Sequence, residues 1–405
     1  MTDPVTDASP TPVRRAAPAA AVGIALFLAA CLVPWIGIYT GEQVEDVRLF
    51  QTFGERFLAG EIPYRDYFLE YPPGALTSFV LPALAAANDF TLAFKLLHIL
   101  FGCALVALVS LTLALLYASH ARLYAATAVT ALTPLVLGPT VLNRYDLWPA
   151  LLTAAALAAL VGGRVLLGPA LLALATVAKG YAIVLLPLAL AYAWRRGGRE
   201  QAKRSLIAYA AAVALVMLPF AVLGPGGLKH SVWIHLRRGL HIESLAASVL
   251  TAADRLGLYT ARVFHGFAVE ITGTLPSLAA AASTLLQLAA LAAVWVVFAR
   301  GEPTRQRVIT ASAAAVTAFV VFGKVLSPQF MIWLVPLVAL VPGVTPAVLV
   351  VVAAALTRGF FPERYGGVTH VGRETWLVLG RNVVLVALFV ALLRLLARER
   401  PSAQS

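Results

Sequence analysis

Apolar runs recur along almost the whole chain, from about residue 16 to residue 396, and they constrain its fold more than any other feature. A bilayer offers no water to the backbone, so such runs fold as membrane helices whose polar groups are satisfied internally. The composition agrees, since 60% of the residues are hydrophobic and 12% are charged, which is far from the usage of soluble domains. We therefore expect a single all-α membrane domain over residues 16–396, with its chemistry on loops and helix ends.

Two terminal segments fall outside this domain: residues 1–15, expected to be disordered and cytoplasmic, and a cytoplasmic tail over 397–405. Arg14 and Arg15, before an apolar run that contains Cys31, resemble a lipoprotein signal with its cleavage site. The run continues past the cysteine and is long enough to span a bilayer, so an uncleaved first helix is favoured. Both cysteines of the chain lie in apolar runs, and we interpret them as packing residues.

Basic residues cluster in short turns between the apolar runs, so the net charge of +12 indicates topology rather than nucleic-acid binding. The cluster over residues 194–204 is the clearest, and the positive-inside rule places it in the cytoplasm. Placing the other basic turns on the same side puts both termini inside and requires an even number of crossings. We expect about twelve spans, over residues 18–38, 92–117, 123–141, 146–161, 165–179, 180–193, 205–223, 275–299, 308–322, 330–342, 346–361 and 376–394.

The apolar segment 73–87 decides the parity of this topology. We interpret it as a half-span packed against other helices. In the alternative, 73–87 crosses fully and 165–193 forms one long helix, which would move Arg144 and Asp146 to the cytoplasmic side. The first arrangement keeps every basic cluster inside. It leaves four sizeable outer segments, over about 39–72, 224–274, 323–329 and 362–375.

The first outer segment contains an amphipathic stretch that begins at Asp46. Its apolar positions 47, 50, 53, 57 and 58 fit one face of a helix lying in the membrane interface. Asp46 is either a helix N-cap or a functional carboxylate, and its position alone does not decide between them. Farther on, Glu70 and Tyr71 precede Pro72 and Pro73, which hold an extended backbone and favour a polar pocket wall.

Arg144 and Asp146 open a helix at the same outer level, where they are either a helix-start pair or ligand contacts. Lysine is rare, and four of the five lysines lie at or near predicted outer helix ends: Lys95, Lys179, Lys229 and Lys324. Cations on this side run against the general bias and indicate an anionic partner such as phosphate. The alternative is that they reach toward lipid headgroups.

The second large outer segment contains Arg238, His241 and Glu243 among further basic and aromatic residues. The spacing of its histidines matches no helical ligand pair, which argues against a metal, and a basic segment facing lipid phosphate or sugar fits better. Lys324 and Gln329 flank a proline-broken junction between two spans. The sequence contains neither a glycine-rich phosphate loop nor a serine nucleophile elbow nor an H-E-x-x-H motif, so soluble nucleotide chemistry is unsupported.

Four stretches together resemble the multi-spanning glycosyltransferases of the C-type fold, specifically the bacterial family 87 group that uses polyprenyl-phosphate sugars. They are Asp46 with residues 60–66 and 70–73, residues 143–146 leading to 179–181, residues 238–244, and residues 327–333. The resemblance runs over most of the chain. It implies a C-type glycosyltransferase fold, a bundle of about twelve transmembrane helices with amphipathic interfacial helices in the first outer loop.

The same resemblance implies an inverting transferase in the cell membrane, which moves a sugar from a polyprenyl-phosphate donor to a glycolipid or polysaccharide acceptor on the extracytoplasmic face. Mannose is the first expectation for the sugar. In that family an acidic residue of the first outer loop is the general base, which maps onto Asp46, with Glu45 and Glu42 as neighbouring alternatives. The residues expected to bind the donor phosphate or substrate are Lys179, Lys324, Arg144, Arg238, Asp146, Glu70, Tyr71, His241, Glu243 and Gln329. Neither a metal nor a cofactor is expected, because basic side chains can neutralise the leaving phosphate.

Two other classes of protein stay open on this sequence. A transporter or flippase of lipid-linked sugars would need similar basic residues, although the sequence shows no inverted repeat. A non-catalytic membrane assembly factor would use Asp46 only as a cap, and Asp46→Asn would then leave cellular glycolipids unchanged.

Overall fold

The computed structural model describes residues 11–39, 46–85, 89–266 and 268–398, and these residues are mostly helical. The first half contains α1 (Pro12–Cys31), α2 (Asp46–Leu58), α3 (Thr77–Ala85), α4 (Phe90–Leu115), α5 (His120–Ala131), α6 (Thr133–Leu137), α7 (Leu147–Val161), α8 (Leu167–Ala178) and α9 (Leu186–Leu223). The second half contains α10 (Pro225–Arg237), α11 (Leu245–Arg255), α12 (Thr274–Arg300), α13 (Arg305–Phe322), α14 (Met331–Ala339), α15 (Val344–Phe360), α16 (Tyr365–Thr369) and α17 (Thr375–Arg398). Short 3-10 helices are η1 (Pro73–Leu76), η2 (Gly138–Val141), η3 (Gly180–Leu185) and η4 (Pro328–Phe330).

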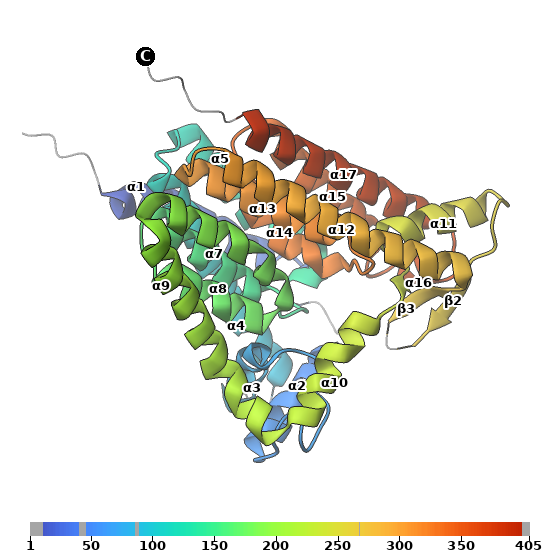
Figure 1. The fold of residues 1–405 in the computed structure, drawn as a ribbon. Helices are drawn as coiled ribbons and strands as arrows, with labels where there is room; N and C mark the ends of the chain where they lie inside the picture. The colour runs from blue at the N-terminus through green and yellow to red at the C-terminus, as the bar shows by residue number, and fades with distance from the viewer. Residues whose placement is uncertain (1–10, 40–45, 86–88, 267, 399–405) are drawn as a thin grey trace, which may run out of the picture.

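Helix α13 forms the centre of one half of the bundle. Nearly all of its side chains are buried, and it packs against α12, α14 and α17. Its run of alanines and valines lets the neighbouring backbones approach closely, as packing between apolar helices requires. Figure 1 shows α12, α13 and α17 side by side along the top of the molecule, with α9 descending on the left. From behind, α1 lies along α4 and α5.

Five helices are long and apolar enough to cross a membrane: α1, α4, the η3–α9 segment, α12 and α17. A sixth crossing is possible if α5 and the bent segment that follows it count as one span. Five more apolar helices are shorter than a full span, and one of them is Pro73–Ala85, which was predicted to be a half-span. Within the described residues the structure therefore supports a protein with five or six potential spans, and the count of twelve crossings stays a prediction.

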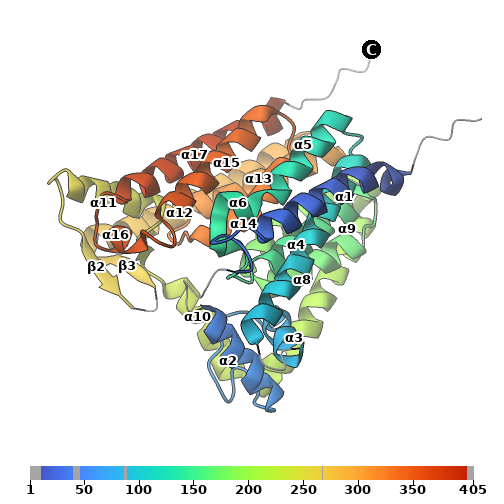
Figure 2. The same ribbon diagram turned by 180° about the vertical axis from the view of Figure 1, so that it is seen from behind.

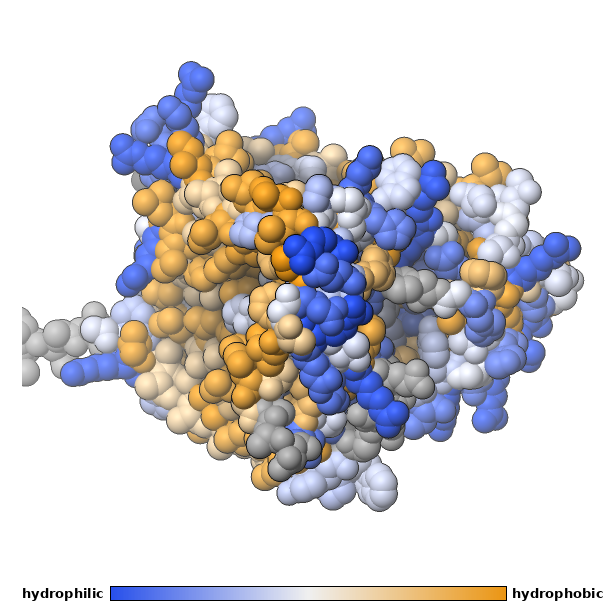
Figure 3. All heavy atoms as spheres, turned by 90° about the horizontal axis from the view of Figure 1, so that it is seen from below, coloured by the Kyte–Doolittle hydropathy of each residue, from blue (hydrophilic) through white to orange (hydrophobic). Residues whose placement is uncertain are grey.

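The surface is divided as expected for a molecule partly embedded in lipid. Seen from below, hydrophobic side chains cover the left half of the face, and hydrophilic side chains gather beside them (Figure 3). Large exposed apolar side chains on α9 include Leu215, Leu218 and Val222. Water would disfavour such a continuous apolar surface, whereas lipid chains accommodate it.

The basic turns that were predicted to be cytoplasmic lie close to one another. Arginine side chains from several of these turns donate hydrogen bonds to backbone carbonyls or side chains of other turns at the same end of the bundle. The contacts are Arg15 with Ala118, Arg122 with Gln306, Arg195 with Ala299, Arg305 with Leu115, and Arg307 with Leu396. This arrangement matches the first topology, which gives all of these turns the same side.

The amphipathic stretch of the first outer segment forms α2, as predicted. Val47, Phe50 and Phe53 are buried in an aromatic cluster, where the Phe50 ring stacks on Phe79 with centroids 4.6 Å apart. The expected apolar face is wrong at its end, because Phe57 and Leu58 are exposed in the last turn of α2. The aromatic cluster buries the first two turns of α2, whereas its last turn projects beyond that cluster.

A small antiparallel sheet departs from the expected all-α class. Its strands are β1 (Leu240–His241), β2 (Arg262–His265) and β3 (Val269–Thr272), in the order β1-β3-β2. These strands are short and alternate in polarity, a pattern that favours a half-buried sheet over a helix. Ile271 is buried with Leu240 and Ile242 in a separate apolar cluster, which also contains the end of α15. The sheet thus fixes the turn that carries Arg238 and Glu243.

Helix α9 joins two segments that were predicted as separate spans, 180–193 and 205–223. The chain stays helical through the basic cluster except at Gly197 and Gly198, where the backbone breaks. Gly198 has φ 72°, a left-handed conformation that glycine adopts without steric cost. Two helical pieces therefore meet at a kink rather than at a loop.

Candidate functional site

Asp46 begins α2, and its carboxylate forms an ion pair with the guanidinium of Arg144. Arg144 lies in the turn before α7, so the pair joins two segments far apart in the sequence. It also places both residues at one end of the bundle, which is what the half-span interpretation of 73–87 requires. The alternative parity would have put them on opposite sides of the membrane. Glu45 and Glu42, the alternative bases, lie outside the described residues.

Asp146 is a buried carboxylate with two donors on one oxygen. Lys179 Nζ and Trp333 Nε1 approach its Oδ1 at 2.6 and 2.7 Å. Asp146 stands at the N-cap position of α7, but its side chain makes no capping hydrogen bond. Asp146 therefore stands at the start of α7 without capping it, and the ion pair of Arg144 is with Asp46. The Asp146 carboxylate instead connects α7, the α8–η3 junction and α14.

Lys179 lies where α8 ends and its backbone turns extended before η3. Its ammonium lies 4.4 Å from the centroid of the Tyr145 ring and 5.1 Å from that of Trp333. Trp333 in turn stacks on Tyr181, with centroids 4.0 Å apart. Aromatic faces attract a cation electrostatically, so these rings and Asp146 hold Lys179 inside the protein. Lys179 is therefore not a lysine that reaches outward to lipid headgroups.

Glu70 forms a looser ion pair, with Oε2 3.5 Å from Arg238 Nη2. Burial raises the pKa of Glu70, while hydrogen bonding from Tyr71 and the charge of Arg238 oppose that rise. The backbone carbonyl of Glu70 accepts a hydrogen bond from Ser231 Oγ at 3.0 Å, and His235 Nε2 lies 2.8 Å from it. Helix α10 thus holds the loop that carries Glu70.

Glu243 is almost fully buried beside Arg381 of α17. Its Oε2 lies 3.7 Å from Arg381 Nη1, and its backbone carbonyl accepts hydrogen bonds from Arg381 Nη2 at 2.7 Å and Asn382 Nδ2 at 3.1 Å. Burial raises the pKa of Glu243 to about 7, although Arg381 and a hydrogen bond with Tyr365 act in the opposite direction. A carboxyl group of this kind changes its charge near neutral pH.

Arg144 connects these pairs into one site. Besides Asp46, its guanidinium is under the electrostatic influence of Asp146 and Glu243, and it lies 5.9 Å from the centroid of the Phe361 ring. Lys179 likewise influences Glu70. The site therefore contains four carboxylates and four cations, namely Asp46, Glu70, Asp146, Glu243, Arg144, Lys179, Arg238 and Arg381.

Four residues of this site were not predicted as site residues: Tyr365, Arg381, Asn382, and Trp333, which was named only as the end of the stretch 327–333. Arg381 and Asn382 interrupt the last apolar run of the chain, and a charge in such a run is a functional signal that could have been found. Trp333 gives no such signal, because a tryptophan in an apolar helix usually packs in the core. Its indole N–H identifies it only once Asp146 is placed beside it.

Three predicted residues lie at the edge of this site. Lys324 Nζ donates to the carbonyl of Leu236 at 2.8 Å, and Gln329 Oε1 accepts a hydrogen bond from Ser327 Oγ. His241 donates its backbone N–H to the carbonyl of Lys324 at 3.0 Å, and burial lowers the pKa of its imidazole to about 4. Among the residues that the structure describes, no group of three His, Cys, Asp or Glu side chains could hold a metal ion.

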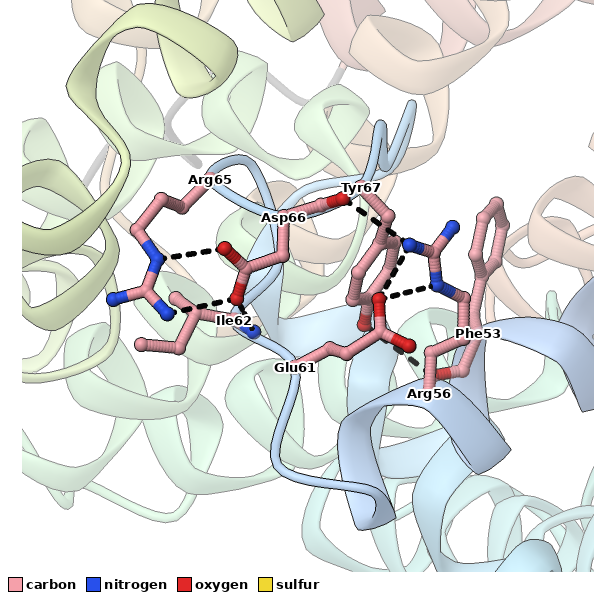
Figure 4. Close-up of polar contacts among 7 residues, drawn as sticks. All are labelled: Phe53, Arg56, Glu61, Ile62, Arg65, Asp66 and Tyr67. Atoms are coloured by element: carbon pink, nitrogen blue, oxygen red, sulfur yellow. Dashed lines mark hydrogen bonds and ion pairs between the residues drawn. The ribbon is translucent and has the colours of Figure 1, made fainter.

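Two arginine–carboxylate contacts fix the loop between α2 and Glu70 (Figure 4). Arg65 donates from Nε and Nη2 to the two oxygens of Asp66, each at 2.8 Å, and Arg56 pairs with Glu61. Hydrogen bonds from Arg65 and from the Ile62 backbone lower the pKa of Asp66 to about 2. Both pairs are exposed, so their contribution is to shape the loop rather than to stabilise the fold.

An apolar groove of about 390 Å³ lies between the end of α9 and α10. One charged side chain, Lys229, is part of its lining. Leu236 is also part of its lining; the carbonyl of Leu236 accepts a hydrogen bond from Lys324, and Arg238 follows two residues later. The lining residues are Met217, Ala221, Pro225, Leu228, Lys229, Val232, Trp233 and Leu236.

Fold and site define a helical protein with several helices able to cross a membrane and with a set of buried and partly buried charge pairs at one end of its bundle. A scan against models of protein families finds no match for the chain, and a search of curated proteins finds none either.

Proposed function

We propose that this protein is an inverting glycosyltransferase that moves a sugar, mannose in the first instance, from a polyprenyl-phosphate donor to a lipid or cell-envelope glycan acceptor outside the cell membrane. The observation that carries the proposal is the pairing of Asp46 with Arg144 beside the buried Asp146 and Lys179. It combines a partly exposed carboxylate, which can act as a base, with cations that can stabilise a leaving phosphate.

The groove between α9 and α10 supports a lipid-linked substrate. Its lining is apolar apart from Lys229, and one lining residue, Leu236, is hydrogen-bonded to Lys324 and lies two residues before Arg238. A polyprenyl phosphate likewise combines an apolar chain with an anionic head, which match an apolar groove and nearby cations. Chain and head would therefore each meet a suitable surface at the same time.

In the proposed reaction, Asp46 takes the proton of the acceptor hydroxyl while the hydroxyl oxygen attacks the anomeric carbon of the donor sugar. The attack comes from the face of the sugar opposite the phosphate. The bond between the anomeric carbon and the phosphate oxygen breaks, and the phosphate leaves with the bonding electron pair. The configuration at the anomeric carbon is inverted. Lys179, Arg144 and Arg238 would stabilise the charge that develops on the leaving oxygen, so the step needs no metal.

Transfer of radiolabelled sugar from a polyprenyl-phosphate donor tests the proposal, with membranes that contain equal amounts of wild type or Asp46→Asn. Loss of a general base should reduce transfer about a hundred- to ten-thousandfold. The matched control is Glu200→Gln, which removes an exposed carboxylate paired with Arg204 at the predicted cytoplasmic end and should transfer normally. Unchanged transfer by Asp46→Asn would exclude Asp46 as the base, and a wild type without any product would favour a flippase of lipid-linked sugars.

A further inference from the structure

The cations of the site are already matched by carboxylates before any substrate binds. Arg144 pairs with Asp46, Lys179 with Asp146, Arg238 with Glu70 and Arg381 with Glu243. A phosphate that enters such a site binds more strongly if one cation exchanges its carboxylate for the phosphate. The four pairs differ in their exposure to solvent and in the distance between their charged groups, and both decide how readily such an exchange occurs.

Two of the pairs are poorly suited to exchange. The Glu243–Arg381 side chains are 1% and 0% exposed, so separating them would leave two buried charges without partners. Asp146 is 1% exposed, and it is held by Trp333 as well as by Lys179. In the Asp46–Arg144 pair, by contrast, the carboxylate is 25% exposed, the most of the four, and water can solvate it when its partner leaves.

The Glu70–Arg238 pair is also partly exposed, at 10% and 22%, but its separation of 3.5 Å is longer than a hydrogen bond. Arg238 could therefore contact a phosphate without giving up a hydrogen bond to Glu70. The guanidinium of Arg144, by contrast, is in direct contact with Asp46, so a phosphate that takes the edge of the guanidinium facing Asp46 displaces that carboxylate. Exchange of partners is thus a property of the Asp46–Arg144 pair.

We propose that Arg144 exchanges partners when substrate binds: it holds Asp46 in the ligand-free protein and moves onto the phosphate of a lipid-linked donor, which releases the Asp46 carboxylate for proton abstraction. The inference rests on the proposed function, and it adds the order of events. A guanidinium binds phosphate through two parallel hydrogen bonds, so a phosphate ester competes well with a single carboxylate. A carboxylate in contact with arginine is a weaker base, so Asp46 becomes competent only when a donor occupies the site.

The surroundings of Arg144 permit this movement. Besides Asp46, the groups that face its guanidinium are Asp146 and Glu243, the hydroxyl of Tyr365 and the ring of Phe361. Its Nε has no hydrogen-bond partner within the described structure. The side chain is therefore held at one end by Asp46 and is otherwise guided by charge and by an aromatic face rather than by a network of fixed hydrogen bonds.

A double-mutant cycle on binding tests the exchange without requiring transfer. The probe is a radiolabelled short-chain polyprenyl phosphate, bound to purified protein in detergent, with inorganic phosphate as a competitor that distinguishes headgroup from lipid binding. Asp46→Asn removes the competitor for Arg144 and should bind the probe about fivefold more tightly. Arg144→Gln should bind it about tenfold more weakly, and adding Asp46→Asn to Arg144→Gln should give no gain.

Two results would overturn the exchange. If Asp46→Asn binds the probe no better than wild type, Asp46 does not compete for Arg144. If the gain persists in the Arg144→Gln background, it is a through-space effect of charge and not an exchange of partners. Arg144→Lys serves as a second variant if Arg144→Gln does not fold, since it keeps the charge but loses the two-pronged contact and should retain only part of the gain.

The outcome is separable from that of the proposed function. If the binding measurements follow the expected cycle but the wild type makes no glycoside, the exchange is supported and the transferase activity is excluded. If the wild type transfers sugar but wild type and variants all bind the probe equally, the transferase activity is supported and the exchange is excluded. Glu200→Gln is the control for both measurements, since it lies at the opposite, basic end of the bundle.

Discussion

At the scale of single residues, the site depends on the hydrogen-bond and ion-pair partners that each polar side chain finds inside an apolar bundle. Asp146 accepts from both Lys179 and Trp333 on one oxygen, whereas its other oxygen has no hydrogen-bond partner within the described structure. A buried carboxylate held in this way is sensitive to the loss of either donor, because the desolvated charge remains when the donor is gone.

Trp333→Phe tests this sensitivity. The substitution keeps an aromatic ring against Tyr181 but removes the indole N–H that donates to Asp146. A hydrogen bond to a charged group contributes about 1.5–3 kcal/mol, so the free energy of unfolding should fall by roughly that amount. Trp295→Phe is the matched control, since Trp295 donates to the neutral carbonyl of Val184 and should cost about 0.5–1.5 kcal/mol. Thermal unfolding in detergent measures both, and an equal loss in the two variants would contradict the prediction.

Glu243 gives the protein a dependence on pH with a definite sign. Its pKa is about 7 in the folded protein, against an ordinary value of 4.5, so the folded chain binds more protons than the unfolded chain between these values. Stability contributed by Glu243 is therefore greatest below pH 4.5 and is lost as the pH rises toward about 7. Glu243→Gln cannot ionise and should lose less stability between pH 5 and pH 8, by on the order of 3 kcal/mol. Melting temperatures measured from about pH 5 to pH 8 test this. If they fall equally in the wild type and in Glu243→Gln, Glu243 does not titrate in this range.

At the scale of elements, helix α10 positions the loop that carries Glu70. Ser231 and His235 of α10 contact the carbonyl of Glu70, and the first turn of α10 lies against the backbone of Tyr64. Two adjacent glycines in that turn have different surroundings. A side chain at Gly227 would collide with the carbonyl of Tyr64, whereas one at Gly226 would meet open space.

These glycines form a matched pair for testing whether α10 shapes the site. Gly227→Ala should push α10 away from the Tyr64 loop and reduce both stability and donor binding, because backbone cannot yield as a flexible side chain does. Gly226→Ala should instead stabilise the helix by about 0.5–1 kcal/mol and leave binding unchanged. Polyprenyl-phosphate binding and melting temperature compare the two, and similar behaviour would mean that the contact of α10 with the loop is dispensable.

At the scale of the whole molecule, the charge pairs of the site gather at one end of the bundle and the basic turns at the other. The Asp46–Arg144 pair and the contact of Arg195 with Ala299 belong to these opposite ends. The positive-inside rule gives the basic end to the cytoplasm, so the site should open on the outer side.

Labelling of single cysteines in intact cells checks this orientation. Cys31 and Cys103 are first replaced by alanine, and then Arg364→Cys or Arg199→Cys is introduced at an exposed position near each end. A membrane-impermeant maleimide should label position 364 in intact cells, and position 199 only after the cells are opened. Labelling with the reverse preference would place the site in the cytoplasm, where a polyprenyl-phosphate donor of the proposed kind is not expected.

Much of the secondary structure could be predicted from the sequence, because apolar length and the position of prolines and glycines act locally. Each of the twelve predicted spans contains a helix, and the half-length of 73–87 was also expected. The exceptions lie where contacts decide the outcome. Gly197 and Gly198 kink a helix instead of ending it, and the strands around Ile271 form because an apolar cluster covers one side of them.

The sequence by itself determined that this chain folds in an apolar environment and that basic turns separate many of its apolar runs. It also determined that Asp46, Arg144, Asp146 and Lys179 are candidates for one site. Hydrophobic length and charge sign are properties of short stretches, and they act before the chain has folded. Only the tertiary structure decided the partners. Arg144 binds Asp46 rather than its near neighbour Asp146, and Glu243 meets Arg381 from the last helix, because pairing in a low dielectric depends on which side chains the packing of distant helices brings into contact.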